Sequence, residues 1–329
     1  MTLLREGERR ILEMLRSREG GDVAWDELCR RTEMDRADAA RAVDGLLGSG
    51  YLIEERAGHG VRLVGEPEPF SVDGVSSLAP PGFLSDVHVF GLAGSTNEIA
   101  SRLAAGRPGR NAIVLAEAQT SGKGRHRRRW FSPGGVGLWF SLVLWPDLDV
   151  AGMTSLGLVA SIAVASAVRR QLSLDAVVKW PNDVLIGDRK VCGILSELGD
   201  AGGVPCAVVG MGINVNQREE DFPESFRRLA CSLRMHAGGI VDRRVMLRAV
   251  LEEMAGRYRR VEREGFSPFR VEWETLSSML GQTVRLAEGR CSVTGTVLGV
   301  ADSGALRICD RSGEEHHVVA GDVEILDRG

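Results

Sequence analysis

The feature that most constrains the fold of this chain is a basic, glycine-containing loop between two short apolar segments. Residues 119–133 read Q-T-S-G-K-G-R-H-R-R-R-W-F-S-P, and positions 123–129 carry five fixed positive charges and one histidine. The apolar segments at 111–116 and 137–145 are continuous and rich in valine, leucine and aromatic residues. Such short runs are typical of buried strands. The sequence therefore predicts a sheet in which a cationic loop connects two core strands.

This loop is suited to binding a small anion. Gly122 and Gly124 let the backbone approach a ligand and turn its N–H groups inward. Arginine presents a planar fork that matches phosphate oxygens. The other interpretation is a solvated loop or a nucleic-acid patch. The glycines and Trp130 favour a pocket for a polyphosphate or another anion.

Composition excludes several classes of protein. The 329 residues carry a net charge of −4, so the positive loop is a local feature, and this length predicts two or three domains. Six cysteines are scattered without paired spacing, which indicates neither a disulfide framework nor a zinc site. The charged N-terminus has no secretory h-region, and the apolar run at 155–168 is too short to span a bilayer. We expect a cytoplasmic protein without membrane association.

The first 64 residues predict a winged helix-turn-helix. Helical spacing at 5–18, 25–31 and 36–47 is followed by two strands at 51–55 and 61–64. One interpretation is DNA binding through the third helix, with Arg36 and Arg41 as contacts. The other is a module for stability, dimerisation or domain docking. Residues 1–64 hold eleven arginines, no lysine and thirteen acidic residues, a poor supply of charge for neutralising phosphates.

The remaining chain predicts an α+β protein of several domains. A linker without periodicity is expected at 65–84 and a mixed-sheet α/β domain at 85–275. Short strands separated by turns over 276–329 predict a small SH3-like β-barrel. The group of His316, His317 and their neighbouring glutamates is interpreted as polar surface.

Two places in the central domain offer polar groups to a ligand. Ser95 and Glu98 have capping-box spacing at the start of a helix, whereas Thr96 and Asn97 could grip a carbonyl or ring nitrogen. Lys190 lies on a predicted strand among apolar neighbours, where a lysine usually extends its charge into solvent. Gly193 on that strand leaves space for a ligand near the backbone.

Five motifs occur together in a fixed order. They are S-T-N at 95–97, G-x-G-R-x-x-R-x-W at 122–130, K-W-P-N-D at 179–183, D-R-K-V-C-G-I-L-S-E at 188–197 and G-x-G-I-N at 210–214. With a winged helix ahead and a small barrel behind, the whole chain resembles the bifunctional form of biotin–protein ligase, which also represses biotin genes.

The resemblance implies a two-step reaction. Biotin and ATP with Mg²⁺ give biotinyl-5′-adenylate and pyrophosphate, and a lysine of the biotin carboxyl carrier domain of acetyl-CoA carboxylase then accepts biotin. It further implies operator DNA as a partner and a monomer–homodimer equilibrium. Two other hypotheses remain: a ligand-sensing transcription factor with a vestigial ligase core, and a lipoate or octanoate ligase.

The resemblance also implies roles for individual residues. The implied catalytic residues are Lys190, Arg125 and Asp183, of which Asp183 orients the attacking amine or a metal. The implied biotin contacts are Ser95, Thr96, Asn97, Gln119, Gly122, Lys123, Arg125, Lys190, Gly193, Gly210 and Gly212. The implied ATP or adenylate contacts are Lys123, Arg125, Arg128, Trp130, Asn182, Lys190 and Asn214. No side chain is assigned as a metal ligand, and no C-terminal contact is carried over from the family.

Two loop positions differ from the family pattern. Lys123 stands where arginine is usual, which keeps the charge and loses the bidentate fork. Arg127 replaces a common glycine, so we expect a stiffer backbone there.

Overall fold

The computed structural model describes residues 4–18, 20–48, 50–56, 58–65, 69–288 and 291–327. The N-terminal part consists of helices α1 (Glu6–Ser17), α2 (Trp25–Thr32) and α3 (Arg36–Gly48), followed by a hairpin of β1 (Leu52–Arg56) and β2 (Gly60–Gly65). These elements match the expected order. Asp35 caps α3 by accepting a 2.7 Å hydrogen bond from the Asp38 N–H. Fully buried Ile11, Leu15 and Leu46 form a separate small core.

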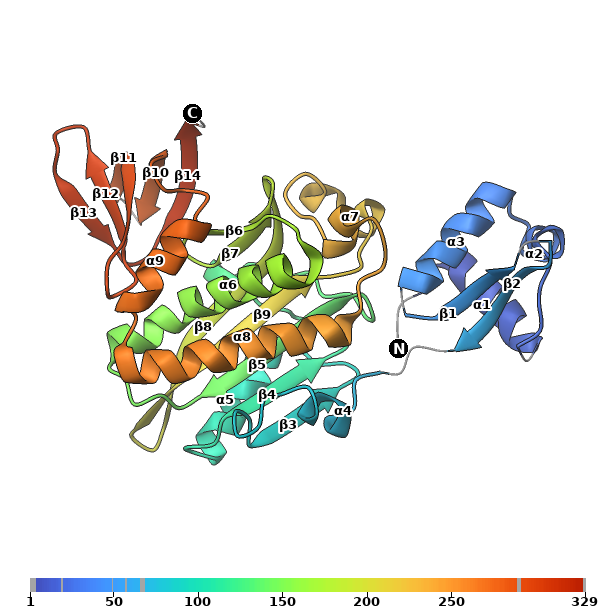
Figure 1. The fold of residues 1–329 in the computed structure, drawn as a ribbon, viewed down its shortest axis with the longest axis horizontal. Coiled ribbons are helices and arrows are strands. Elements are labelled where there is room, and N and C mark those ends of the chain that lie inside the picture. The colour runs from blue at the N-terminus through green and yellow to red at the C-terminus, as the bar shows by residue number, and fades with distance from the viewer. Residues whose placement is uncertain are drawn as a thin grey trace.

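A seven-stranded mixed sheet forms the centre of the molecule (Figure 1). Its order is β3-β4-β5-β9-β8-β7-β6. Strands β3 and β4 are parallel, and the other neighbours are antiparallel. The strands are β3 (Asp86–Phe90), β4 (Ala112–Ala116), β5 (Gly137–Leu144), β6 (Ala176–Lys179), β7 (Asp183–Ile186), β8 (Arg189–Ala201) and β9 (Val204–Asn214). Strands β4 and β5 are buried at every residue, which explains their continuous apolar sequence.

Helices cover both faces of this sheet. Alternate residues of a strand point to opposite faces. Ile113 of β4 belongs to the large core with helices α6 (Val150–Leu172), α8 (Arg243–Glu264) and α9 (Ser267–Leu276). Val114 packs with α5 (Thr96–Gly106) on the other face. The segment Gly152–Leu172 of α6 has the length and hydropathy of a membrane span, but 78% of its apolar window is buried in the protein. It is the core helix of this sheet.

The expected linker at 65–84 is largely packed rather than extended. Residues 66–68 lie outside the described part, and from Phe70 onward the chain joins the large core. Val75 of the short helix α4 (Val72–Ser76) is fully buried, and Phe83 is 3% exposed. The Phe70 N–H donates to Glu117 Oε1 over 3.0 Å. This segment contains prolines and a single helical turn, so its sequence shows no helical or strand periodicity.

The C-terminal part is a five-stranded sheet of order β13-β12-β11-β10-β14. Its strands are β10 (Thr283–Glu288), β11 (Cys291–Val300), β12 (Leu306–Asp310), β13 (Glu315–Val318) and β14 (Asp322–Asp327). The Trp180 indole N–H donates to the Gly304 carbonyl over 3.1 Å, which fastens this sheet to the end of β6. One further short helix, α7 (Leu233–Ala237), precedes α8.

Candidate active site

One cavity of about 730 Å³ opens at the junction of the central and C-terminal sheets. Its walls come from the start of α5, the basic loop, strands β6 to β9, residues 222–230 and the start of β14. Nearly all predicted site residues line it together: Ser95, Thr96, Asn97, Gln119, Lys123, Arg125, Arg128, Trp130, Asn182, Asp183, Lys190, Gly193, Gly210, Gly212 and Asn214. Gly122 is not part of the lining, and Arg36 and Arg41 lie in the N-terminal part.

A buried polar network fixes the wall at the start of α5. The Thr96 N–H donates to Gln119 Oε1 over 2.8 Å, and the Gln119 amide donates to Ser132 Oγ over 2.9 Å. The Ser141 hydroxyl lies 2.6 Å from Asn97 Oδ1, whose amide donates to Glu197 over 2.8 Å. These side chains are held in one geometry, as recognition of a polar ligand requires.

The expected capping box at this helix is absent. Ser95 is the N-cap residue, but its side chain makes no capping hydrogen bond. Glu98 instead lies 2.7 Å from Lys123 Nζ, and this ammonium holds the pKa of Glu98 below its usual value. A charged partner from the loop outcompetes the backbone N–H for this carboxylate.

The basic loop folds back on itself. Trp130 N–H donates to the Gly122 carbonyl and Gly124 N–H to the Arg128 carbonyl, each over 2.8 Å. A Cβ at Gly122 would lie 2.6 Å from the Trp130 carbonyl oxygen, so glycine is required by the loop itself. Arg127 has φ +59°, the left-handed region where glycine is favoured. The arginine is accommodated at this position with backbone strain.

Two loop arginines contact the C-terminal part. Arg125 donates to the Gly321 carbonyl over 3.3 Å, and Arg128 lies 2.6 Å from Asp322. Burial lowers the pKa of Arg125, while the carboxylates of Asp322 and Asp183 oppose that shift. A guanidinium stays protonated under these conditions. Arg125 is therefore a partly desolvated cation in the lining of the cavity.

Lys190 joins the same electrostatic cluster. Its Nζ lies 2.6 Å from Asp183 Oδ1 and 5.2 Å from the centre of the Trp130 ring. Arg125 lines the same cavity, where the Asp183 charge also supports its protonated form. Lys190 thus points into the cavity and not simply to solvent.

The cavity glycines make room for neighbouring side chains. A Cβ at Gly212 would collide with the Trp130 indole, and one at Gly193 would lie 2.9 Å from the same ring. A Cβ at Gly210 would collide with the Asn97 amide. The Trp130 ring packs against the backbone at Gly193 and Gly212. The missing side chain of Gly210 leaves space for Asn97.

Two predicted nucleotide contacts also hold the backbone. Asn182 donates to the Ile194 carbonyl over 2.7 Å. Asn214 is buried and donates to the Cys231 carbonyl over 3.0 Å. Both side chains fix strands around Lys190.

The structure adds lining residues that sequence reasoning missed. The polar ones are Lys179, Arg129, Asp188 and Asp322, and the apolar ones include Phe222, Phe226, Leu229, Val323 and Ile325. Lys179 is the first residue of the K-W-P-N-D motif and could have been inferred from it. Arg129 and Asp188 likewise lie inside quoted motifs. These apolar residues and Asp322 lie outside every motif, in segments distant along the chain. Six fixed cations and three carboxylates line the cavity, so its net charge favours anionic ligands.

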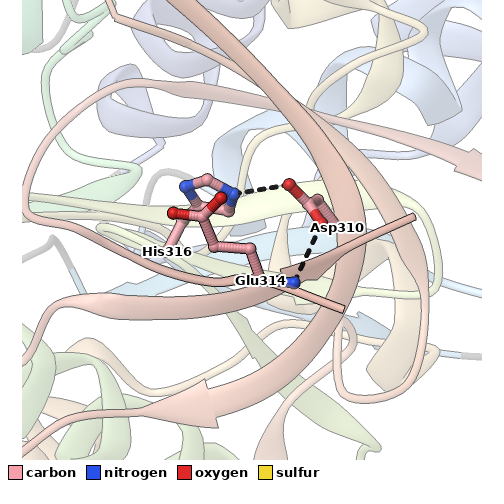
Figure 2. Close-up of side chains that lie close together, drawn as sticks. All are labelled: Asp310, Glu314 and His316. Atoms are coloured by element: carbon pink, nitrogen blue, oxygen red, sulfur yellow. Dashed lines mark hydrogen bonds and ion pairs between the residues drawn. The ribbon is translucent and has the colours of Figure 1, made fainter. Parts of the chain in front are cut away.

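A second polar cluster lies in the C-terminal sheet. Figure 2 shows Asp310, Glu314 and His316, whose ligand atoms lie within 4.8 Å of one another. His316 Nε2 is 2.8 Å from Asp310 Oδ2, and the Glu314 N–H donates to Asp310 Oδ1 over 3.0 Å. Asp310 thus closes the turn between β12 and β13, consistent with the expected polar surface.

Comparison with known proteins gives one family. Residues 92–214 match the Biotin/lipoate A/B protein ligase family, and residues 279–326 match the Biotin protein ligase C terminal domain. The chain is 30% identical over 285 residues to Bifunctional ligase/repressor BirA of Bacillus subtilis (strain 168), covering 86% of this chain and 87% of that protein. It is 32% identical over 225 residues to Biotin--[acetyl-CoA-carboxylase] ligase of Paracoccus denitrificans, covering 67% and 93%.

A solved structure agrees. Biotin protein ligase from Aquifex aeolicus in complex with biotin and ATP superimposes with a TM-score of 0.65 at 29% identity, covering 74% of this chain and 100% of that chain. The cavity, its cations and the near full-length relatives lead to the same conclusion: this chain belongs to the biotin protein ligase family.

Proposed function

We propose that this protein activates biotin with ATP and transfers it to a lysine of the biotin carboxyl carrier domain of acetyl-CoA carboxylase. The observation that carries the proposal is one cationic cavity that Arg125, Asp183 and Lys190 line together, with the Lys190 ammonium 2.6 Å from Asp183. The relatives named biotin ligases support the choice of substrates.

In the first step a biotin carboxylate oxygen attacks the α-phosphorus of ATP. A P–O bond forms, the bond to the β-phosphate oxygen breaks, and pyrophosphate leaves. Both reactants are anions, so fixed cations lower the barrier by offsetting their repulsion. We assign this role to Lys190 and Arg125, and we assign the outer phosphates to Arg128 and Lys123, all of which line the cavity.

In the second step the amine of the carrier lysine attacks the acyl carbon of the adenylate. The C–O bond to AMP breaks, and the nitrogen loses a proton. An anionic ligand would compete with Asp183 for Lys190 and so free the Asp183 carboxylate, which is 2.6 Å from that ammonium. We assign the freed Asp183 carboxylate as the base that accepts this proton.

We assign the two ends of the ligand from the lining. The network of the buried Thr96 and Asn97 with the partly buried Gln119 suits the ureido group of biotin. Trp130 suits the adenine, and its buried indole N–H has no acceptor among the described residues. Asn182 and Asn214 hold the walls between these ends. Gly122 is not assigned to the ligand, because it is needed for the close backbone contact within the loop.

Mg²⁺ enters this proposal as part of the ATP substrate. Mg²⁺ in such sites is held mainly by substrate phosphates with one or two carboxylates. Of the lining carboxylates, Asp183 and Asp322 are each paired with a cation, so they are available only after rearrangement. The ion would neutralise phosphate charge.

The test is biotin-dependent exchange of pyrophosphate into ATP, followed by labelling of a carrier domain. Competition between biotin and lipoate in the exchange assay distinguishes a lipoate ligase. The match of residues 279–326 to a biotin ligase domain favours biotin. Absence of any exchange would favour a vestigial core and overturn the proposal.

A second candidate function is transcriptional repression. The relatives named bifunctional ligase/repressor support it, and the N-terminal helices and hairpin fit a winged helix-turn-helix. However, Arg36 stacks on Trp25, and Arg41 pairs with Asp38. A gel shift with and without biotin and ATP, titrated with salt, tests DNA binding, which must weaken steeply as salt rises.

We further propose the domain organisation. Residues 1–64 form the winged helix-turn-helix, the linker is the short stretch up to Phe70, the catalytic domain extends to 275, and 276–329 form an SH3-like domain. A cytoplasmic location fits the use of ATP.

A further inference from the structure

The N-terminal part contacts the catalytic domain through α3 and α1. Arg218 follows β9, and its guanidinium donates to Glu8 of α1 and to the Arg41 carbonyl of α3, each over 2.9 Å. Arg234 of α7 pairs with Asp44 of α3. The two arginine side chains are 13% and 12% exposed, and that of Glu8 is 8% exposed. Both charges of the Arg218–Glu8 pair are therefore largely removed from water, whereas the Asp44 side chain is 51% exposed.

Gly45 of α3 makes this contact possible. A Cβ at this position would collide with both the Arg218 guanidinium and the Glu8 carboxylate. Glycine inside a helix costs about 1 kcal/mol relative to alanine. Glycine is needed at position 45 because the Arg218 side chain approaches the backbone of α3 there. Figure 1 shows α3 on the side of the N-terminal part that faces the α7 segment.

The segment that α3 holds is also a wall of the active site. Between Arg218 and Arg234 lie Phe222, Phe226 and Leu229, all of which line the cavity. The Lys190 N–H donates to the Leu229 carbonyl over 2.8 Å, and the Cys231 N–H donates to the Lys190 carbonyl over 3.0 Å. Lys190 is therefore tied through its own backbone to a segment whose two ends are fastened to the N-terminal domain.

We propose that the C-terminal half of α3 is an intramolecular docking surface for residues 218–234. Arg218, seated on Gly45 against Glu8, is a positioning residue that holds the cavity wall around Lys190. The N-terminal domain thus supports ligand binding at a distance, and its third helix is occupied by the catalytic domain. The predicted change in KM rests on the proposed function. The docking of α3 rests only on the contacts described above.

The experiment uses two variants of the full chain on opposite sides of the contact, Arg218→Ala and Gly45→Ala. The alanine at 45 favours the helix itself, so its effect cannot be ascribed to a weakened α3. Both variants are expected to increase the radius of gyration in small-angle X-ray scattering. Both are expected to raise KM for ATP and biotin in pyrophosphate exchange about fivefold or more, with kcat changed less.

Matched controls are Arg257→Ala and Gly256→Ala. Arg257 is equally buried, at 16% exposed, and paired with Glu253 and Glu272 far from the N-terminal domain. Gly256 lies inside α8 with open space for a Cβ. Both controls are expected to keep the wild-type radius of gyration and KM.

The two arms separate the possible failures. An unchanged radius of gyration in both test variants shows that α3 is not docked in solution and overturns the proposal. If the N-terminal domain detaches and the KM values for ATP and biotin stay unchanged, Arg218 has no positioning role. If the wild-type chain shows no biotin-dependent exchange, the proposed function fails. The radius of gyration from X-ray scattering then still tests whether α3 is docked on the catalytic domain.

Discussion

At the residue scale, the proposed mechanism gives Lys190 the task of offsetting the charge of two anionic reactants. Its ammonium lines the cavity, 2.6 Å from Asp183. We expect Lys190→Ala to lower biotin-dependent pyrophosphate exchange by at least about 100-fold, since one such electrostatic contact typically contributes 10²–10³ in rate. Arg260→Ala, in an exposed ion pair with Glu264, serves as the control. Exchange within twofold of wild type would remove Lys190 from the mechanism.

A second residue-scale prediction concerns Gly210. A Cβ there would collide with the Asn97 amide and break its contact with Ser141. We expect Gly210→Ala to lower the free energy of unfolding by about 1–3 kcal/mol, because overpacking displaces a buried polar group. Thermal unfolding measures this change. Gly256→Ala, with open space around its Cβ, should be neutral or slightly stabilising.

At the scale of elements, the turn between β12 and β13 predicts a pH dependence. Hydrogen bonding to Asp310 raises the pKa of His316, and the Arg307 guanidinium lowers the pKa of Glu315 to about 2. A raised histidine pKa contributes stability that is complete below the unfolded value near 6.5 and is lost as pH rises through the folded value. The lowered pKa of Glu315 contributes stability that is present above about 4.5 and lost as pH falls.

Thermal unfolding across pH measures this contribution. The gap between wild type and His316→Gln should be largest near pH 6 and should narrow as pH rises above the folded pKa of His316. A gap that stays constant from pH 5 to 9 would show that the Asp310 contact does not depend on protonation.

Elements with strong local patterns were predictable from sequence, and packed segments without them were not. The strands β4 and β5 and the helix α3 were expected because apolar runs and helical spacing mark them locally. The helix α4 was missed, since one turn carries no periodicity and its stability comes from burial of Val75. Glu98 was assigned to a cap because spacing alone cannot reveal the competing ammonium of Lys123.

At the scale of the whole molecule, the open prediction is dimerisation. Strand β3 is an edge of the central sheet, and the resemblance to the bifunctional ligases implies association once the adenylate forms. We expect analytical ultracentrifugation to show a shift toward twice the single-chain mass when biotin and ATP are added. Lys190→Ala, which should not form adenylate, should remain a monomer. A single monomeric species under every condition would contradict this expectation.

The sequence by itself determined the class of fold and brought forward most of the polar side chains that line the cavity. All of them except Gln119 lie in five short motifs, whose chemistry and local strand or turn are encoded by neighbouring residues. Only the tertiary structure decided their partners: Lys190 with Asp183, Glu98 with Lys123, and Arg128 with Asp322. It also decided that α3 contacts Arg218, some 170 residues away in the chain. Contacts across such separations depend on how packed layers meet, and no local pattern of residues records that arrangement.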